Sequence, residues 1–240
     1  MAKAKLYLLP TTMGSENWEH VIPSEIAKLA VETRYFAVEN IKSARRFLRR
    51  LDRAFPIDDC TFFELSKKTP PEELPAMLKP IQNGHNVAIV SEAGCPGIAD
   101  PGADLVALAH QKGVFVSPLT GPSSILLALI GSGFNGQSFV FHGYVAKERK
   151  QRIREFKDYE KIATKTGQTQ IFMETPFRNM NLLEDLLNEC MDATQLCIAC
   201  DLTMPTERIQ TMSVAEWREN AFDLNKRPTM FLIGKFYTHN

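Results

Sequence analysis

Short apolar runs alternate with amphipathic stretches through the first half of the chain. Residues 5–9 (KLYLL), 35–38 (YFAV) and 87–90 (VAIV) are nearly free of polar alternation. Runs of this kind are typical of strands that are buried on both faces of a parallel sheet. Helical spacing of apolar residues follows each run, for example in residues 23–33 and 101–111. The pattern predicts an α/β domain with a mostly parallel sheet and helices on both faces.

The second half has more strand-like runs and fewer helical ones. Strands are expected at residues 138–142, 170–173, 196–199, 208–212 and 230–234. Short turns between several of them predict a mixed sheet. The chain turns at residues 117–124 (SPLTGPSS), and the domain boundary is placed there, giving domains 1–118 and 119–240.

One strand-to-helix connection is unusually long. The run at 87–90 leads into a loop that carries Glu92 and is rich in glycine and proline, with Gly94, Pro96, Gly97, Pro101 and Gly102. Such connections usually take about 2–6 residues, and ligands bind at the carboxyl ends of parallel strands. The loop is therefore predicted to bind a ligand; a purely structural turn is the alternative. Polar loops with proline or glycine also follow the strands near residues 10, 121 and 175.

Basic residues are concentrated in two stretches of a chain that has 28 basic and 28 acidic residues. Residues 42–53 hold six basic and one acidic residue, and residues 147–157 hold six and two. In the first stretch Ser43 is expected to cap a helix whose apolar stripe lies opposite the arginines. An anionic partner such as RNA phosphate would explain both runs, and a solvated helix face is the alternative.

Composition excludes several classes. With no net charge, the chain is not a strongly basic protein that coats nucleic acid. Its five scattered cysteines predict reduced thiols in a cytoplasmic protein, and no apolar run reaches the roughly 20 residues of a membrane span. On one strand Cys197 and Cys200 would point to opposite faces, so no metal site is expected. Dinucleotide-binding and Walker A glycine motifs are absent.

Seven motifs occur in the order found in a known superfamily: LYLLPTTMG, AVENIK, VAIVSEAGCPGIADPG, PLTGPSSILLAL, FHGYVAKERKQR, IFMETPFRN and DLTMPTERI. Over nearly its whole length the chain resembles the tetrapyrrole methylase superfamily. Within it, the chain is most similar to the members that methylate a ribose 2′-hydroxyl of ribosomal RNA. The resemblance implies two α/β domains, S-adenosylmethionine bound in a cleft between them, and a homodimer.

The resemblance also implies which residues bind the cofactor. They would come from strand ends and loops of both domains, namely Leu9, Pro10, Glu92, Ala93, Gly94, Pro96, Ser123, Ser124, Ile125, Met173, Thr175, Pro176, Pro228 and Thr229. The RNA would contact the two basic runs, through Lys42, Arg45, Arg46, Arg49, Lys147, Arg149 and Lys150. Glu39 matches the family's glutamate at a strand end and is the candidate general base. An ordinary cap or surface carboxylate is the alternative for Glu39.

Departures from the family pattern fall mainly on the substrate side. Where relatives have E-D-T-R this chain has Glu39-Asn40-Ile41-Lys42, and Glu92 replaces a shorter aspartate. Met204 replaces a lysine. These changes leave two other hypotheses open. One is methylation of a small molecule such as a tetrapyrrole, and the other is a non-catalytic module that keeps the cofactor pocket.

Overall fold

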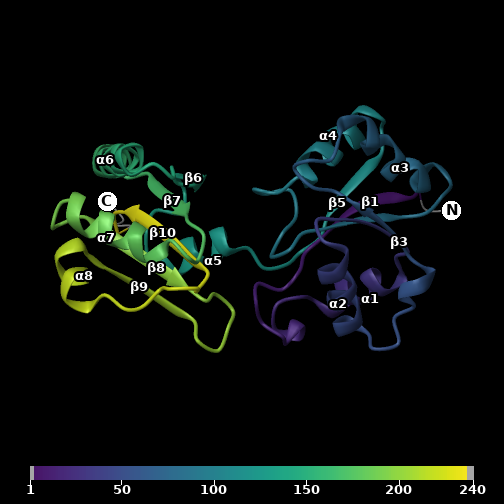
Figure 1. Ribbon diagram of the computed structural model, residues 1–240, viewed down its shortest axis with the longest axis horizontal. Coiled ribbons are helices and arrows are strands. Elements are labelled where there is room, and N and C mark those ends of the chain that lie inside the picture. Colours follow the sequence, from purple (N-terminus) through teal and green to yellow (C-terminus); the bar gives the residue numbers. More distant parts are fainter. Residues whose placement is uncertain (1–2, 237–240) are drawn as a thin grey trace. The chain divides into compact units, whose positions relative to one another are not determined.

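The computed structural model describes residues 3–236, which divide into two compact units (Figure 1). The first unit ends at Ser123 and the second begins at Ser124. The sequence-based boundary after residue 118 falls five residues earlier than this division. Residues 119–123 belong to the first unit because they contact its first strand and one of its loops: the Leu119 amide donates to the Leu8 carbonyl at 3.1 Å, and the Cys95 thiol lies 3.3 Å from the Pro122 carbonyl.

The first unit is a five-stranded sheet with the order β3-β2-β4-β1-β5, in which every neighbouring pair is parallel. Its strands are β1 (Lys5–Leu9), β2 (Tyr35–Val38), β3 (Thr61–Glu64), β4 (Val87–Val90) and β5 (Phe115–Pro118). Its α-helices are α1 (Ser24–Glu32), α2 (Ile41–Leu51), α3 (Leu74–Gln82) and α4 (Gly102–Gln111). Short 3-10 helices lie at Trp18–His20, Ile57–Asp59 and Pro71–Glu73.

Strand β4 shows why the sheet has helices on both sides. All four of its residues are buried, as its apolar sequence predicts. Val87 and Ile89 pack in one core cluster with residues of α3 and α4, whereas Ala88 and Val90 pack in another with residues of α2. Figure 1 shows α1 and α2 on one face of the sheet and α3 and α4 on the other.

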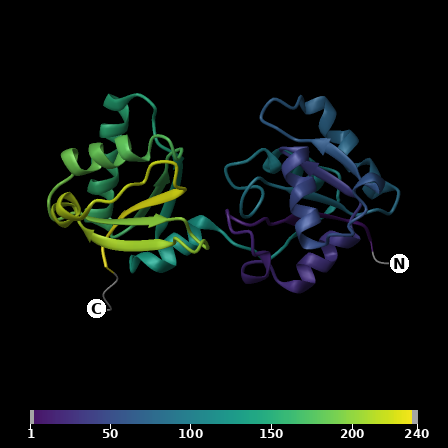
Figure 2. The same cartoon turned by 60° about the horizontal axis from the view of Figure 1, so that its bottom comes forward.

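The second unit contains a mixed sheet with the order β6-β7-β10-β8-β9, in which only the β6–β7 pair is parallel among residues 124–236. Its strands are β6 (Phe139–Tyr144), β7 (Thr169–Met173), β8 (Gln195–Cys200), β9 (Arg208–Ser213) and β10 (Thr229–Gly234). Its helices are α5 (Ser124–Ser132), α6 (Arg149–Thr166), α7 (Asn179–Glu189) and α8 (Val214–Asn220). One core cluster joins the sheet to α6, α7 and α8, and the teal helix α5 lies across the strands from the green helices in Figure 2.

The strand after α4 begins within the apolar run of residues 114–116. It is observed as β5, Phe115–Pro118, and leaves out Val114. The Val114 amide donates to the Ala109 carbonyl at 2.9 Å, which closes the end of α4. Because the Val114 amide is already bonded, pairing with β1 begins at the next residue. Lys5 is aligned with Phe115, and Leu8 with Pro118.

The prediction that Ser43 caps α2 is wrong. The helix begins at Ile41, and its N-cap is Asn40, whose side-chain oxygen accepts a hydrogen bond from the Ser43 amide at 3.1 Å. Asparagine is among the best N-cap residues because its short side chain reaches the free amides of the first turn. The Ser43 hydroxyl instead donates to the Glu92 carboxylate at 3.2 Å.

Replacing the cap should therefore weaken the first unit. Asn40→Ala is expected to lower the free energy of unfolding by about 1 kcal/mol, because one first-turn amide loses its partner. Ser43→Ala is the matched control and should cost less than half as much, since the Ser43–Glu92 contact is exposed. Urea denaturation of both variants measures the difference, and equal losses would contradict the assignment of the cap.

Candidate active site

The loops that follow β1, β4 and β5 contact one another at the carboxyl edge of the first sheet. The Thr11 amide donates to the Gly94 carbonyl at 2.9 Å, and the Thr11 hydroxyl donates to the Ser91 carbonyl at 3.3 Å. The Cys95 thiol lies 3.3 Å from the Pro122 carbonyl. Because β1 pairs with both β4 and β5, these three loops are neighbours by topology.

Two glycines permit this close approach. A Cβ atom at Gly121 would lie 2.3 Å from ring carbons of Pro10, a distance that no side chain can occupy. Gly94 has φ +69°, in the left-handed region, and a Cβ there would lie 3.1 Å from the Pro122 carbonyl oxygen. Both glycines are therefore required by packing. This explains the glycine at position 121, shortly before α5.

The long loop after β4 is held in shape by Asp100. Its carboxylate accepts hydrogen bonds from the Gly97 amide at 2.8 Å and from the Gly102 amide at 2.7 Å. A Cβ at Gly102 would lie 2.8 Å from the same carboxylate. Asp100 therefore fixes the turn from the loop into α4.

Glu39 lies near two further carboxylates at this edge. Its pKa is raised above the ordinary 4.5, first because burial disfavours the charged form, and also because of the negative charges of Asp100 and Glu92. A hydrogen bond from the Glu92 backbone opposes the shift in part. Glu39 directly follows β2, in a setting that raises the pKa of its carboxylate, and its role as general base stays a prediction.

The cofactor-binding residues predicted in the first unit differ in exposure. The side chain of Leu9 is fully buried in the core, so only its backbone is available at the sheet edge. Glu92 and Ala93 are exposed at the tip of the loop, whereas Gly94 and Pro96 are buried within it. Pro10 is also buried, as its contact with Gly121 requires. Their role in cofactor binding stays a prediction.

The loops of the second unit are also joined to each other. The Lys226 amide donates to the Pro176 carbonyl at 3.0 Å, and the Asp201 amide donates to the Pro228 carbonyl at 2.9 Å. The Thr229 hydroxyl donates to the Arg227 carbonyl at 3.0 Å. The structure thus brings the predicted residues of the 173–176 and 228–229 segments together. Ser124 and Ile125 lie in the first turn of α5 and are half-buried.

An ion pair that the sequence did not reveal supports these loops. Asp201 is nearly buried, and it accepts from the Arg227 guanidinium at 2.7 Å and from the Thr206 hydroxyl at 2.8 Å. The Arg227 guanidinium also donates to the Thr206 carbonyl at 2.9 Å. No spacing rule connects residues 201 and 227. The only signal for the pair was its position, because Asp201 directly follows β8 and Arg227 shortly precedes β10, the strand that pairs with β8.

The same loops hold strained backbone and unpaired polar atoms. Asp201, Thr203 and Lys226 have φ between +51° and +68°, which non-glycine residues rarely adopt. Within residues 3–236, the buried Oδ1 of Asn179 and Oγ1 of Thr203 have no hydrogen-bond partner. The Asn179 amide nitrogen donates to the Arg227 carbonyl at 2.7 Å. Strain together with buried unpaired oxygens is typical of a site that binds a polar ligand.

The first basic run forms α2, where its arginines differ in their contacts. Arg45 pairs with Asp58 at 3.1 Å, and the Arg49 guanidinium donates to the Arg53 carbonyl at 3.1 Å. Lys42 and Arg46 are exposed and have no polar partner within the described part of the chain. The positive charge of α2, which is predicted to attract an anionic partner, is therefore only partly neutralised by contacts within the protein.

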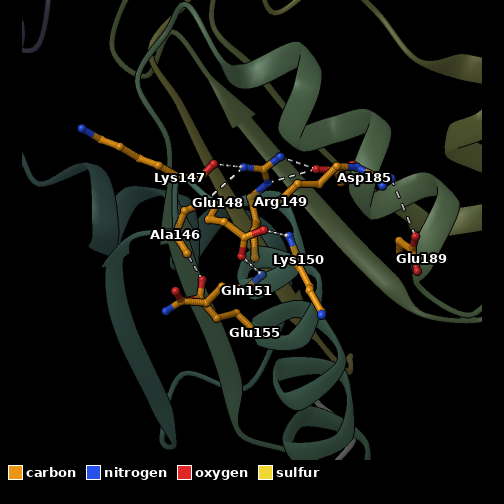
Figure 3. Close-up of polar contacts among 10 residues, drawn as sticks. Ala146, Lys147, Glu148, Arg149, Lys150, Gln151, Glu155, Asp185 and Glu189 are labelled. Carbon is orange, nitrogen blue, oxygen red and sulfur yellow. Dashed lines mark hydrogen bonds and ion pairs between the residues drawn. The ribbon is translucent and has the colours of Figure 1, made fainter.

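The second basic run is more strongly paired than its composition suggests (Figure 3). Arg152 is buried and forms an ion pair with the buried Asp185, and the exposed Arg149 also reaches Asp185 at 2.7 Å. Figure 3 shows the Lys147 and Lys150 side chains pointing away from this group. Of the three residues predicted to bind RNA here, Arg149 is held by α7, and Lys147 and Lys150 are exposed.

The family can now be assigned from sequence comparison. A sequence profile of the tetrapyrrole (corrin/porphyrin) methylases matches residues 26–217. The chain belongs to this family. The methylase is 33% identical to ribosomal RNA small subunit methyltransferase I of Vibrio cholerae over 88% of this chain and 69% of the relative. The protein of the same name from Halalkalibacterium halodurans is 33% identical over 77% of this chain and 60% of its own length. The one from Escherichia coli O157:H7 is 29% identical over 90% of this chain and 71% of its own length.

Solved structures share the fold of this methylase. The methyltransferase CobJ superposes with a TM-score of 0.62 at 17% identity, covering 99% of this chain and 96% of that protein. Uroporphyrin-III C-methyltransferase of Thermus thermophilus gives a TM-score of 0.58 at 15% identity, covering 97% and 95%. The predicted α/β fold with a parallel first sheet and a mixed second sheet is confirmed.

Among residues 3–236, no three His, Cys, Asp or Glu side chains are grouped so that they could hold a metal ion. Within the same residues, no helix has the length and apolar character needed to span a bilayer. Cys197 and Cys200 are both buried on β8, and only Cys200 joins the core cluster with α6 and α7.

The two arginines that share Asp185 should differ sharply in their contribution to stability. Arg152→Met is expected to lower the free energy of unfolding by about 3–5 kcal/mol, because it leaves a buried carboxylate without its buried partner. Arg149→Met should cost about 1 kcal/mol or less, since Arg149 is exposed. Thermal and urea unfolding measure both, and similar costs would show that Arg152 is not the main partner of Asp185.

Proposed function

We propose that this methylase transfers a methyl group from S-adenosylmethionine to a ribose 2′-hydroxyl of small-subunit ribosomal RNA. The observation that carries the proposal is the 33% identity, over 88% of the chain, to a relative named for that RNA. The matched region is about 60–70% of the relatives' length, so their activity as whole proteins comes to this chain as a proposal. The exposed cations of α2 agree with an RNA acceptor. A homodimer and a cytoplasmic location belong to the same proposal.

The loops described above suit the cofactor. A ligand with amino, carboxylate and purine groups needs backbone donors and acceptors, and both units supply them at loops with strained or glycine backbone. We assign the binding to Pro10 and residues 92–96 of the first unit, to residues 123–125, and to Met173, Thr175, Pro176, Pro228 and Thr229. The unpartnered Asn179 oxygen is a further candidate contact in the second unit.

When bound, S-adenosylmethionine supplies an electrophilic methyl group on its sulfonium. The protein then has to align the acceptor hydroxyl with that methyl, and such positioning can be worth about 7–11 kcal/mol. The hydroxyl must also lose its proton. Glu39 is our candidate base, because a carboxylate with a raised pKa accepts a proton more readily near neutral pH. The neighbouring Glu92 and Asp100 carboxylates would stabilise its protonated form.

Removing this base should affect turnover and stability in opposite directions. Glu39→Gln is expected to lower kcat by about 10²–10⁴-fold with little change in cofactor affinity. It should also raise the melting temperature at pH 7. The raised pKa means that folded Glu39 holds its proton more tightly than unfolded Glu39, so wild-type stability falls as pH rises above 4.5 through the folded pKa.

Melting curves at several pH values check the sign. The advantage of the glutamine variant should fade below about pH 4.5, where the glutamate is protonated in both states. Glu64→Gln, a change to an exposed carboxylate at the end of β3, is the matched control. If the higher melting temperature persists at low pH, or if Glu64→Gln also shows it, the raised pKa of Glu39 is not its cause. Unchanged kcat in the Glu39 variant would exclude it as the base.

The acceptor is tested directly by mass spectrometry of small-subunit rRNA from a deletion strain and its parent. We expect one ribose methyl group to be absent from the deletion strain and to be restored by the purified protein with S-adenosylmethionine. Identical modification profiles would reject RNA as the acceptor. Calorimetry with S-adenosylmethionine and S-adenosylhomocysteine tests the cofactor. If the protein binds neither compound, both methyltransferase hypotheses are rejected.

A small tetrapyrrole is the second candidate acceptor, and the family name favours it. The superposed methyltransferases, at 15–17% identity, establish the fold and leave the acceptor open. A shift of the Soret band when a porphyrinoid is titrated into the protein would support this candidate. No shift, together with a lost rRNA methyl group in the deletion strain, would exclude it.

A further inference from the structure

A cavity of about 200 Å³ lies in the first unit between α2 and the loops after β1 and β4. Its wall on the helix side includes Ser43, Arg46 and Arg50. The opposite wall includes Thr11, Thr12, Ser91 and Glu92. Arg50 was not among the residues predicted to bind substrate. The cavity is therefore lined mainly by polar residues, with two arginines on one side, and its Glu92 is also a neighbour of the candidate general base Glu39.

The arginines of α2 form two rows that differ in their access to this pocket. Arg46 and Arg50 are four residues apart, so they lie on one face of the helix, together with Ser43. Arg46 has no polar partner in residues 3–236, and Arg50 donates only to the Ser15 carbonyl, at 3.4 Å. Arg45 and Arg49 form the other row and are not part of the lining. Arg46, which has no polar partner among the described residues, thus lines the pocket, and Arg50 lines it with a single long bond to a carbonyl.

The pocket has one anionic and one cationic end. The Ser43 hydroxyl donates to Glu92 at the first turn of α2, whereas Arg50 lies seven residues later, about 10 Å along the helix axis. A phosphate would be repelled by Glu92 but would match the planar donors of Arg46 and Arg50, which can bind oxyanions in a bidentate manner. A neutral sugar hydroxyl suits the carboxylate end. The arrangement fits a phosphate that is joined to a sugar.

We propose that Arg46 and Arg50 bind one backbone phosphate of the RNA acceptor, directly beside the ribose that is methylated. This inference rests on the proposed RNA methyltransferase activity and adds the contact that positions the acceptor. The cavity is smaller than the roughly 300–1,000 Å³ of pockets for whole drug-sized ligands, which agrees with a phosphate and part of its sugar. Arg46 and Arg50 then act as positioning residues, and Glu39 keeps the role of base.

The test compares two double variants that remove the same charge from the same helix. Filter binding measures the affinity of the full chain for an unmodified small-subunit rRNA transcript between about 50 and 200 mM salt. Arg46→Gln/Arg50→Gln should lower the slope of log K against log[salt] by roughly 0.7–0.9 for the lost phosphate contact. It should raise the KM for RNA at least fivefold, while S-adenosylmethionine binding by calorimetry and the melting temperature stay as in the wild type. Arg45→Gln/Arg49→Gln should have less than half of each effect on RNA.

Equal effects of the two double variants would overturn the inference, since they would indicate only long-range attraction by the charge of α2. Failure of the wild-type chain to bind the transcript would overturn it as well. If the wild type binds RNA but does not methylate it, the proposed function fails, and the difference in salt slope still decides whether Arg46 and Arg50 contact phosphate. Loss of cofactor binding in the Arg46/Arg50 variant would contradict the assignment to the acceptor.

Discussion

Contact among the loops after β1, β4 and β5 is the constraint on which the candidate site depends. Parallel pairing places the three loops side by side, but their close approach needs glycine at two positions. Gly121 lies against the ring of Pro10, and Gly94 gives its carbonyl to the Thr11 amide. The position of the acidic groups at this edge is therefore set by backbone packing. Side chains such as Glu92 can vary in length among relatives while the backbone that carries them is held in place.

The acidic edge also illustrates a conflict between stability and chemistry. The Glu39 carboxylate is partly buried and lies close enough to Glu92 and Asp100 for their negative charges to raise its pKa. A fold optimised for stability alone would not keep an ionisable group there. Asp100 has a clear structural role in the loop, through its bonds to the Gly97 and Gly102 amides. Among residues 3–236, the Glu92 backbone is the only one that bonds the Glu39 carboxylate, so Glu39 has a smaller structural role than Asp100.

The sequence was informative where local chemistry decides the structure. Uninterrupted apolar runs gave β1, β2 and β4, because strands buried on both faces leave no other pattern. Cap choice failed at Asn40 and Ser43, since both residues can cap and only the end of β2 selects between them. Ion pairs between residues that are far apart in the sequence could not be predicted. Charge counting could not show that Asp185, on another helix, neutralises Arg152, or that Asp201 binds Arg227 across 26 residues. For the same reason Arg50 was not predicted to bind substrate, because the cavity that it lines is completed by the loops after β1 and β4.

The place of β1 in its sheet has a consequence for synthesis of the chain. This first strand pairs with β4 and β5, and its first neighbour in sequence is 81 residues away, as the Lys5–Asn86 contact shows. At about 5–20 residues per second, a ribosome needs several seconds or more to make that partner. The β2–β3 pair can form within this interval, whereas β1, with the apolar Leu6 and Leu9, has no strand to pair with until β4 has been made. The nascent chain therefore exposes an aggregation-prone strand until β4 emerges, and the functional edge of the sheet is among the last parts of the unit to assemble.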